Sequence, residues 1–308
     1  MRLDVNDALP RRGRRRYVRR LVLTLAIVGL SGLVLAPSAF AGFITPKSGG
    51  SPNADQIASL YKVVLYIAAV VFVIVEGALL YSVYKFRAKK GAVAAQIHGN
   101  TCLEIGWTVA AALILVALTV VTFVKLPAII NPPNSSASGI VLSASTTRPT
   151  PPNGKTVTIC VQGRQFIWRY IYGNNCLNGA FSAKLPYSYQ TMYAPANTTV
   201  VLDIQSTDVI HSWWVPSLGG KVDAVPGYTT YTWFKAPNAS SPGHTVEFHG
   251  QCAQLCGRSH AAMTAIVQIL SPADYKAWLA RQNALINAAN NQVTQLRAIL
   301  TASGNLGG

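Results

Sequence analysis

Two long apolar runs stand out in the first half of the chain. The run over residues 63–84 carries a single charge, Glu76, and the run over residues 105–124 carries none. Because about 20 consecutive apolar residues span the hydrocarbon core of a bilayer, this pattern predicts two transmembrane helices. Such helices are oriented by nearby basic residues, which favour the cytoplasmic side. The segment between the two runs contains Lys85, Arg87, Lys89 and Lys90, so we expect the chain after residue 125 to lie outside.

An acidic residue lies within the first predicted helix and another lies at the start of the second. A charge within the membrane is costly, so we expect Glu76 to face a helix interior or a protein partner, with a structural hydrogen bond as its simplest role. Glu104 lies at the cytoplasmic start of the second run. A carboxylate there can be hydrated and collect protons, but the neighbouring Trp107 also suggests an interfacial anchor. The residues alone favour the anchor.

The N-terminal segment is typical of an export signal. It combines a basic start over residues 11–20, an apolar run over 21–36 and the small residues Ala39 and Ala41. A basic region, an apolar centre and an A-x-A pattern form the signature of a signal peptide. We therefore assign residues 1–41 as a signal cleaved after Ala41, with an uncleaved anchor helix as the alternative.

The second half of the chain has the pattern of a β-domain. Residues 131–155 are rich in Pro, Ser and Thr, which is typical of a linker. β-Branched and aromatic runs separated by turn residues follow at 156–161, 166–172, 198–204, 229–234, 245–248 and 264–270. Short strands at such intervals predict an antiparallel sandwich or barrel, which we place at residues 156–271.

A helix is expected to close the chain. Ser271 is a favoured N-cap residue, Pro272 suits the first helical position, and Asp274 puts an acid in the first turn. The residues up to Leu300 are rich in Ala, Gln and Asn. We expect this helix and the tail, residues 272–308, to serve packing or spacing.

The net charge of +16 does not indicate a nucleic-acid partner. Residues 1–41 hold eight arginines against two aspartates, so much of the positive charge lies in the segment expected to be removed. The chain has only five cysteines, too few for a disulfide scaffold of this length. Cys160 and Cys176 fall in the exported domain, where a disulfide between them can form.

The densest cluster of chemistry is a short loop before the last predicted strand. Two cysteines, a histidine and a methionine follow one another there, at spacings of four, four and three: Cys252, Cys256, His260 and Met263. These soft and borderline ligands suit copper. Zinc would use Cys and His alone and leave Met263 without a role, and a pair of buried thiols without metal is the plain alternative.

A further ligand is expected from an earlier strand end, and His211 is the candidate. One Cys with two His and a weak Met forms a mononuclear blue-copper centre. The second Cys on the same loop lets two thiolates bridge two coppers instead. Because a shared electron in a rigid core requires little rearrangement on reduction, this arrangement predicts fast one-electron transfer.

At these residues the sequence resembles subunit II of the haem–copper cytochrome c oxidases, whose dicopper centre is called CuA. The matching segments are residues 211–213, 215–218, 221–227 and 250–263. The resemblance covers about residues 1–280 of the chain. It implies a membrane-anchored all-β chain, with a two-helix transmembrane hairpin, a cupredoxin-like antiparallel β-sandwich and a C-terminal helix.

The resemblance also implies the function and the partners. The chain would accept single electrons from a cytochrome c and pass them to haem in subunit I, where oxygen is reduced and protons are pumped. Its surroundings would be a bacterial-type cell membrane, subunit I with its haem and CuB, and subunit III. The β-domain would stand on the outer face, and no nucleic acid is implied.

The ligand set follows from the same resemblance. His211 and His260 would each bind one copper, Cys252 and Cys256 would bridge, and Met263 and the backbone carbonyl of Gln254 would be weak axial ligands. The family usually has Glu in place of Gln254, and that side chain also helps to bind magnesium at the interface with subunit I. A neutral amide is a poorer ligand for this hard cation, so we predict weakened or absent magnesium binding.

Electron uptake is a second place where the sequence departs from the family. The family has a Gly-x-Gln-Trp-x-Trp segment whose first Trp takes up electrons, and Phe166 holds that place here. The alternatives are Trp168 and the pair Trp213 and Trp214, which we expect to be exposed. Core packing is the simpler interpretation of Trp168, because aromatic strand residues usually pack inward.

Two further expectations concern protons and the donor. Glu104, with Trp107, matches a family position at the mouth of the proton channel into subunit I, which now favours proton uptake over the anchor. Residues 150–308 contain ten Lys and Arg against five acids. Cytochromes c are usually basic and dock through complementary charge, so an acidic or membrane-tethered donor, or apolar docking, fits this chain better.

Two other classes of protein share part of this pattern. A quinol oxidase subunit keeps the fold without copper, but the intact ligand set argues against it. Nitrous oxide reductase has a similar dicopper loop, but the two-helix anchor and the absence of a large catalytic domain disfavour it.

Overall fold

The computed structural model describes residues 45–87, 93, 96, 98–132, 156–173, 185–239, 243 and 245–303. The expected export signal and nearly all of the expected linker lie outside these residues.

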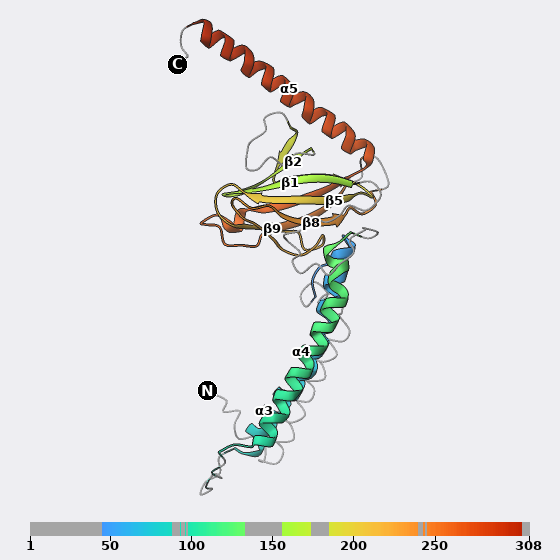
Figure 1. Cartoon of the computed structure of the whole chain (residues 1–308), viewed down its shortest axis with the longest axis vertical. Coiled ribbons are helices and arrows are strands. Elements are labelled where there is room, and N and C mark those ends of the chain that lie inside the picture. Colours follow the sequence, from blue (N-terminus) through green and yellow to red (C-terminus); the bar gives the residue numbers. More distant parts are fainter. Residues whose placement is uncertain are drawn as a thin grey trace, which may run out of the picture. The chain divides into compact units, whose positions relative to one another are not determined.

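Two long apolar helices, α3 (Pro52–Lys85) and α4 (Thr101–Ile130), form a hairpin (Figure 1). Both are long and apolar enough to cross a membrane. They extend beyond the predicted runs because capping residues, rather than the last apolar residue, set their ends. Pro52 opens α3, and the side chain of Asn100 accepts a hydrogen bond from the Leu103 amide at the start of α4.

The hairpin is joined by a polar contact and contains a half-buried acid. Lys125 Nζ in α4 donates to Ser59 Oγ at 3.0 Å and to Gln56 Oε1 at 3.3 Å in α3. Glu76 lies half-buried in α3. The ammonium therefore ties the end of α4 to the start of α3.

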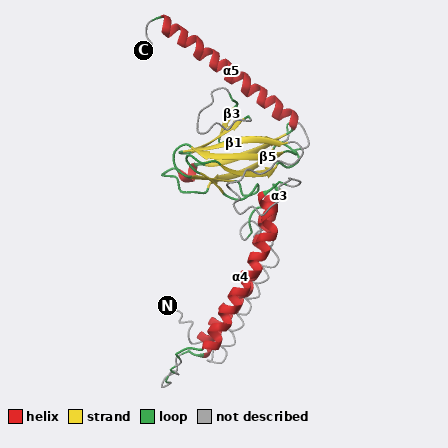
Figure 2. Cartoon of the chain, viewed as in Figure 1, coloured by secondary structure: helices red, strands yellow, loops and turns green. Residues whose placement is uncertain are grey.

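Two five-stranded sheets form the β-domain (Figure 2). The first has the order β3-β2-β1-β5-β8, with β1 Thr156–Arg164, β2 Ile167–Tyr172, β3 Tyr187–Tyr189, β5 Thr199–Ser206 and β8 Thr230–Lys235. The second has the order β4-β10-β9-β6-β7, with β4 Thr191–Pro195, β6 His211–Trp214, β7 Val222–Ala224, β9 Val246–Cys252 and β10 Thr264–Leu270.

The predicted β-sandwich is confirmed, and most neighbouring strands are antiparallel. Two pairs are parallel, β1 with β5 and β10 with β4. The six predicted strands correspond to β1, β2, β5, β8, β9 and β10. β3, β4, β6 and β7 were missed because runs of three to five residues are too short to show a period-two pattern clearly.

The core lies between the two sheets. β10 shows how the pattern places it there, because Ala265, Val267 and Ile269 are fully buried while the residues between them are half-buried. This alternation is the period of two that a strand imposes. Trp168 and Tyr170 of β2 are fully buried in the same cluster.

The C-terminal helix α5 (Pro272–Ala302) is confirmed. Ser271 Oγ accepts a hydrogen bond from the Asp274 amide at 3.1 Å and caps the helix as predicted. Trp278 docks the helix on the sandwich, with its ring 4.8 Å from that of Tyr172 and 4.5 Å from that of Tyr193. Trp278 is the one buried residue of α5, so the first turns of the helix are anchored on the sandwich.

Both helices of the hairpin are connected to β8 by hydrogen bonds. Asn53 Nδ2 donates to the Trp233 carbonyl at 2.8 Å, and Trp233 Nε1 donates to the Ile129 carbonyl at 3.1 Å. The Lys235 amide donates to Ser51 Oγ at 3.0 Å. The start of α3 and the end of α4 therefore meet the same strand.

Candidate metal centre

Neighbouring strands of the second sheet bring the predicted ligands together. His211 begins β6, Cys252 ends β9, and these strands are paired at Trp213 and Cys252. The loop after Cys252 returns through the short helix η2 (His260–Ala262) to Met263, immediately before β10. The Cys252 amide donates to the Met263 carbonyl at 2.8 Å, which closes the base of the loop.

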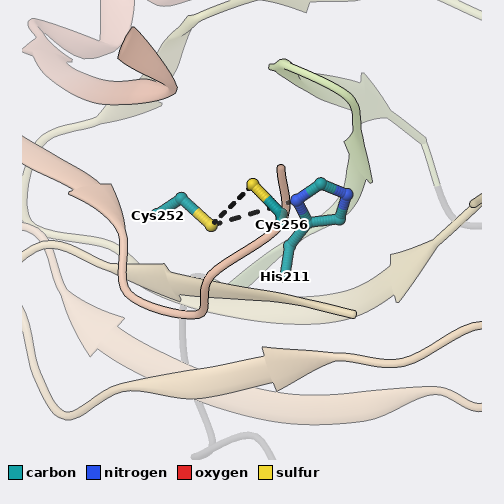
Figure 3. Close-up of side chains that lie close together, drawn as sticks. All are labelled: His211, Cys252 and Cys256. Atoms are coloured by element: carbon teal, nitrogen blue, oxygen red, sulfur yellow. Dashed lines mark hydrogen bonds between the residues drawn. The ribbon is translucent and has the colours of Figure 1, made fainter. Parts of the chain in front are cut away.

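The side chains of His211, Cys252 and Cys256 point toward one another (Figure 3). The two sulfurs of Cys252 and Cys256 are 3.9 Å apart. His211 Nδ1 is 3.9 Å from the Cys252 sulfur, and His260 Nδ1 is 3.5 Å from the Cys256 sulfur. Met263 Sδ lies 4.0 Å from the Cys256 sulfur. The His211 nitrogen and both sulfurs lie within 4.8 Å of one another.

The distances between these sulfur and nitrogen atoms are short enough for the atoms to share a bound metal. A thiolate binds a soft metal at about 2.3 Å, so two atoms that share one metal lie at most about 4.6 Å apart. All four measured pairs fall within that limit. Each sulfur has its own histidine nitrogen beside it, which is the pattern that two bridged metals need.

The burial of these four side chains also supports a metal site. His211 and Met263 are fully buried, and Cys252 and Cys256 nearly so. Burial, together with the neighbouring Cys252, raises the pKa of the Cys256 thiol to about 11. Two adjacent buried thiolates are thus unfavourable by themselves, and a bound cation would stabilise them as their protons leave.

Asp208 orients His211. Its Oδ1 lies 2.9 Å from His211 Nε2, which leaves Nδ1 to face the sulfurs. A carboxylate behind a ligating histidine fixes its tautomer and its ring orientation. Burial opposes ionisation of Asp208, but hydrogen bonds from the Gln165 amide, His211 and the Val209 amide outweigh it and lower the pKa of this carboxyl.

Gln165 links the two halves of the centre. Its backbone amide donates to Asp208 Oδ2 at 2.7 Å, and its side chain donates to the Cys256 carbonyl at 2.7 Å. Sequence reasoning gave no role to Gln165 or to Asp208. The position of Asp208 three residues before His211 was the signal available for it, whereas the contacts of Gln165 span 43 and 91 residues.

Two glycines allow close approach at the centre. A Cβ on Gly163 would lie 2.9 Å from the His211 ring, so only glycine lets β1 pass this histidine without a shift. Gly257 has φ +132°, and a Cβ there would lie 3.0 Å from both the Gln165 amide and the Phe166 ring. The turn carrying Gln165 and Phe166 therefore rests directly on the cysteine loop.

The aromatic candidates for electron uptake separate by burial. Trp168 is fully buried. Its ring packs in a T-shaped contact with the His211 ring, with the ring centroids 5.8 Å apart. The expectation that Trp213 is exposed is wrong, because it is 2% exposed and its Nε1 donates to Tyr170 Oη at 3.3 Å. Trp214 is half-buried under Lys221 Nζ, 4.7 Å from its ring centroid. Phe166 is half-buried as well.

Gln254 and Glu104 have distinct surroundings. Gln254 is exposed, and its carbonyl oxygen lies 3.3 Å from the Cys252 sulfur.

Glu104 is exposed in the first turn of α4, where its Oε1 accepts a hydrogen bond from the Asn100 amide at 3.4 Å. This is the reciprocal half of a helix cap, so Glu104 has a structural role whatever else it does.

Two further cysteines in the described part of the chain, Cys160 and Cys102, are not members of the His211, Cys252 and Cys256 cluster. Cys160 is disulfide-bonded, and Cys176, its expected partner, lies outside the described residues. Cys102 is a free, exposed thiol in α4. The four cysteines in the described part of the chain thus divide into one disulfide half, one surface thiol and two candidate metal ligands.

The fold and the side-chain cluster together define a membrane-anchored, cupredoxin-like protein with a cluster of His and Cys that could bind a metal. Residues 157–270 match the family described as cytochrome c oxidase subunit II, periplasmic domain, and residues 41–124 match its transmembrane domain. The cytochrome c oxidase subunit 2 of Alkalihalophilus pseudofirmus is 34% identical, over 77% of this chain and 61% of that protein. That of Cereibacter sphaeroides is 32% identical, over 83% of this chain and 90% of that protein.

A solved structure is also similar, the crystal structure of the periplasmic domain of subunit II of cytochrome oxidase (CoxB) of Bradyrhizobium japonicum. It is 26% identical, with a TM-score of 0.36, and the match covers 42% of this chain and 95% of that one. The chain therefore belongs to the cytochrome c oxidase subunit II family, as the family matches and the relatives show. Its two apolar helices indicate a membrane protein, and its cluster of His211, Cys252 and Cys256 could bind a metal.

Proposed function

We propose that this chain accepts single electrons from a cytochrome c at a dicopper CuA centre and passes them to haem in subunit I. The observation that carries the proposal is the approach of the Cys252 and Cys256 sulfurs to 3.9 Å, with a histidine nitrogen within 3.9 Å of each. Oxygen reduction and proton pumping would then take place in subunit I.

Six residues would hold the metals. Four side chains, His211, Cys252, Cys256 and His260, are the strong ligands, and Met263 and the Gln254 carbonyl are the weak ones. Two bound coppers would supply a one-electron couple shared across both thiolates. The protein would contribute rigidity, because His211 begins β6 and Cys252 ends β9 and these strands are paired. It would also contribute a dry setting, because His211 and Met263 are fully buried.

Electron uptake is best assigned to Phe166. This ring is half-buried at the surface turn that rests on Gly257, one residue from Cys256. Trp214, half-buried under Lys221, is the second candidate. Trp168 and Trp213 are buried, so any role for them would lie between the surface and the metals.

The placement of the chain in its complex is also a proposal. The basic residues between α3 and α4 favour the cytoplasmic side, so the β-domain would stand on the outer face, where a cytochrome c can reach it. Glu104, at the cytoplasmic start of α4, would take up protons for subunit I. The hairpin would pack against subunit I, and subunit III would complete the assembly.

Copper analysis of the purified full-length chain tests the central proposal. We expect two coppers per chain and a multi-line electron-spin resonance spectrum from one electron shared by both. Cys256→Ser should abolish that spectrum, whereas Cys102→Ser, at an exposed free thiol in α4, should leave it unchanged. A copper-free chain would instead indicate a quinol oxidase subunit, and a four-line spectrum would indicate a mononuclear site.

A further inference from the structure

The surface over the metal ligands is built from three loops that touch one another. We name it the copper-end face: the turn 164–167, the segment 207–210 and the loop 254–258. Gln165 bonds both of the others, through Asp208 Oδ2 and through the Cys256 carbonyl. The Ala253 amide donates to the Ser212 carbonyl at 2.8 Å, which joins the cysteine loop to β6. The face is therefore continuous.

Apolar side chains stand exposed on this face. Leu255, between the two cysteines, is 78% exposed, and Ile210, next to His211, is 45% exposed. Val209 and Ile167 are each 37% exposed. Single exposed apolar residues are ordinary, but a group of them around a functional centre marks a contact surface. Close apolar contact is also what short-range electron transfer between two proteins needs.

The charges on the copper-end face are mainly positive. Arg164 and Arg258 are both exposed, and they flank the contact between Gln165 and Gly257. Asp208 is the one acid among the described residues of these three loops. Its carboxylate is already engaged by the Gln165 amide, the Val209 amide and His211 Nε2. Asp208 keeps its negative charge while it accepts these hydrogen bonds, so the three loops carry two positive charges and one negative charge, a net charge of +1.

A hollow beside the copper-end face is also lined by apolar and charged side chains. Its volume is about 910 Å³ and its walls include Arg164, Gln165, Ile167, Tyr189 and Asp208. Asp208 on its wall also bonds His211 Nε2, so the hollow comes within one side chain of a metal ligand. An edge of a partner that carries carboxylates can lie there, with Arg164 at its rim.

We propose that the electron donor is a redox protein whose exposed cofactor edge is surrounded by apolar side chains and acidic groups, and that it docks on the copper-end face against Arg164 and Arg258. This inference rests on the proposed function and names its partner. In the transfer the donor would lose one electron, copper held by His211, Cys252, Cys256 and His260 would gain it, and no bond would form or break. A donor with a basic docking face, as is usual for cytochromes c, would be repelled here.

The test uses the assembled oxidase and two soluble c-type cytochromes of similar reduction potential, one acidic and one basic. We measure the second-order rate of oxidation of each as salt is raised. Opposite charges speed association by about tenfold or more at low ionic strength, and salt removes the effect. We expect the acidic cytochrome to react faster, with a rate that falls as salt increases, and the basic one to react slowly, with a rate that rises.

Charge reversal locates the effect. The double variant Arg164→Glu with Arg258→Glu should slow the acidic cytochrome by about tenfold and speed up the basic one. Lys276→Glu with Arg297→Glu makes the same change in net charge on exposed residues of α5, and it should change neither rate by much. Equal effects of the two double variants, or faster oxidation of the basic cytochrome by the unmodified oxidase, would overturn the proposal.

The copper spectrum separates this proposal from the proposed function. We record the electron-spin resonance spectrum of every variant. If the unmodified chain lacks the dicopper signal, the proposed function itself fails. If the signal is present and unchanged in the Arg164 and Arg258 variant, any change in rate reports on docking alone.

Discussion

Gln165 donates through its side-chain amide to the Cys256 carbonyl at 2.7 Å, so the turn between β1 and β2 of the first sheet restrains the cysteine loop of the second. Its backbone amide also holds Asp208, which orients His211. One residue thus bears on both sides of the metal centre, and the stability of the centre depends on a contact between the sheets.

Gln165→Ala should loosen the cysteine loop. Removing one hydrogen bond of this kind costs about 1 kcal/mol, so we expect several-fold faster loss of copper to a chelator. Gln268→Ala is the matched control, because that side chain donates to Glu247 at 2.7 Å on the exposed side of β10. Equal rates of copper loss from both variants would show that Gln165 has no special role in holding the loop.

Trp278→Ala should release α5 from the sandwich. Truncating a buried Trp costs about 3 kcal/mol or more, which lowers the amide protection of the first turns of α5 by about 100-fold in hydrogen exchange. Leu285→Ala, at a side chain that is 59% exposed, should change protection little. Unchanged protection in Trp278→Ala would mean that contacts other than the aromatic cluster hold the helix.

Asp274 should make the start of α5 sensitive to acid. Hydrogen bonds from the Gly243 amide and Ser271 Oγ lower the pKa of its carboxyl. A lowered folded pKa means that the stabilisation is present at neutral pH and is lost as pH falls below about 4 through the folded value. Melting temperatures of the unmodified chain and Asp274→Asn should differ at neutral pH and converge in acid. Asp223→Asn, at an exposed acid of β7, gives the baseline, and a gap that widens in acid would contradict this.

Glu104→Gln separates the two roles of this side chain. Glutamine can still accept the hydrogen bond from the Asn100 amide, so the cap of α4 should remain. If Glu104 takes up protons, turnover of the assembled oxidase should fall several-fold while the copper spectrum is unchanged. Glu104→Ala removes both functions and should also lower thermal stability. Full turnover in Glu104→Gln would leave the helix cap as its role.

Gln254→Glu should strengthen magnesium binding in the assembled oxidase. The Gln254 side chain is exposed, whereas its carbonyl faces the Cys252 sulfur, so the substitution adds a hard ligand without altering the copper ligands. We expect affinity for manganese, a spin-active substitute for magnesium, to rise by about tenfold. Gln251→Glu adds the same charge on β9 and serves as control. Tight manganese binding in the unmodified chain would refute the weakened site.

Much of the centre could be predicted because its ligands lie close together in the sequence. Cys252, Cys256, His260 and Met263 occupy twelve residues, so their residue types and spacing already indicate a soft metal. His211 required the further assumption that an earlier strand end supplies a ligand. The pairing of β6 with β9 is what brings it within 3.9 Å of Cys252.

The exposure of the aromatic side chains was harder to predict than the identity of the candidate metal ligands. Trp213 and Trp214 are adjacent and identical, yet one is buried in the core and the other is half-buried beneath Lys221. Their side chains point to opposite faces of β6, as in any strand. Which face is the inner one depends on the packing of the second sheet against the first, and a four-residue strand has too few positions to reveal it.

By itself, the sequence determined the two apolar helices, the sandwich, the closing helix and the candidate metal ligands, because each depends on a local period or on residues near one another in the chain. Only the tertiary structure decided which residues support those ligands. Asp208, Gln165 and Gly163 act across turns and between sheets, through contacts that form when strands pack. Long-range packing also collects Arg164, Arg258 and the exposed apolar residues over the metal centre, and no local pattern records that convergence.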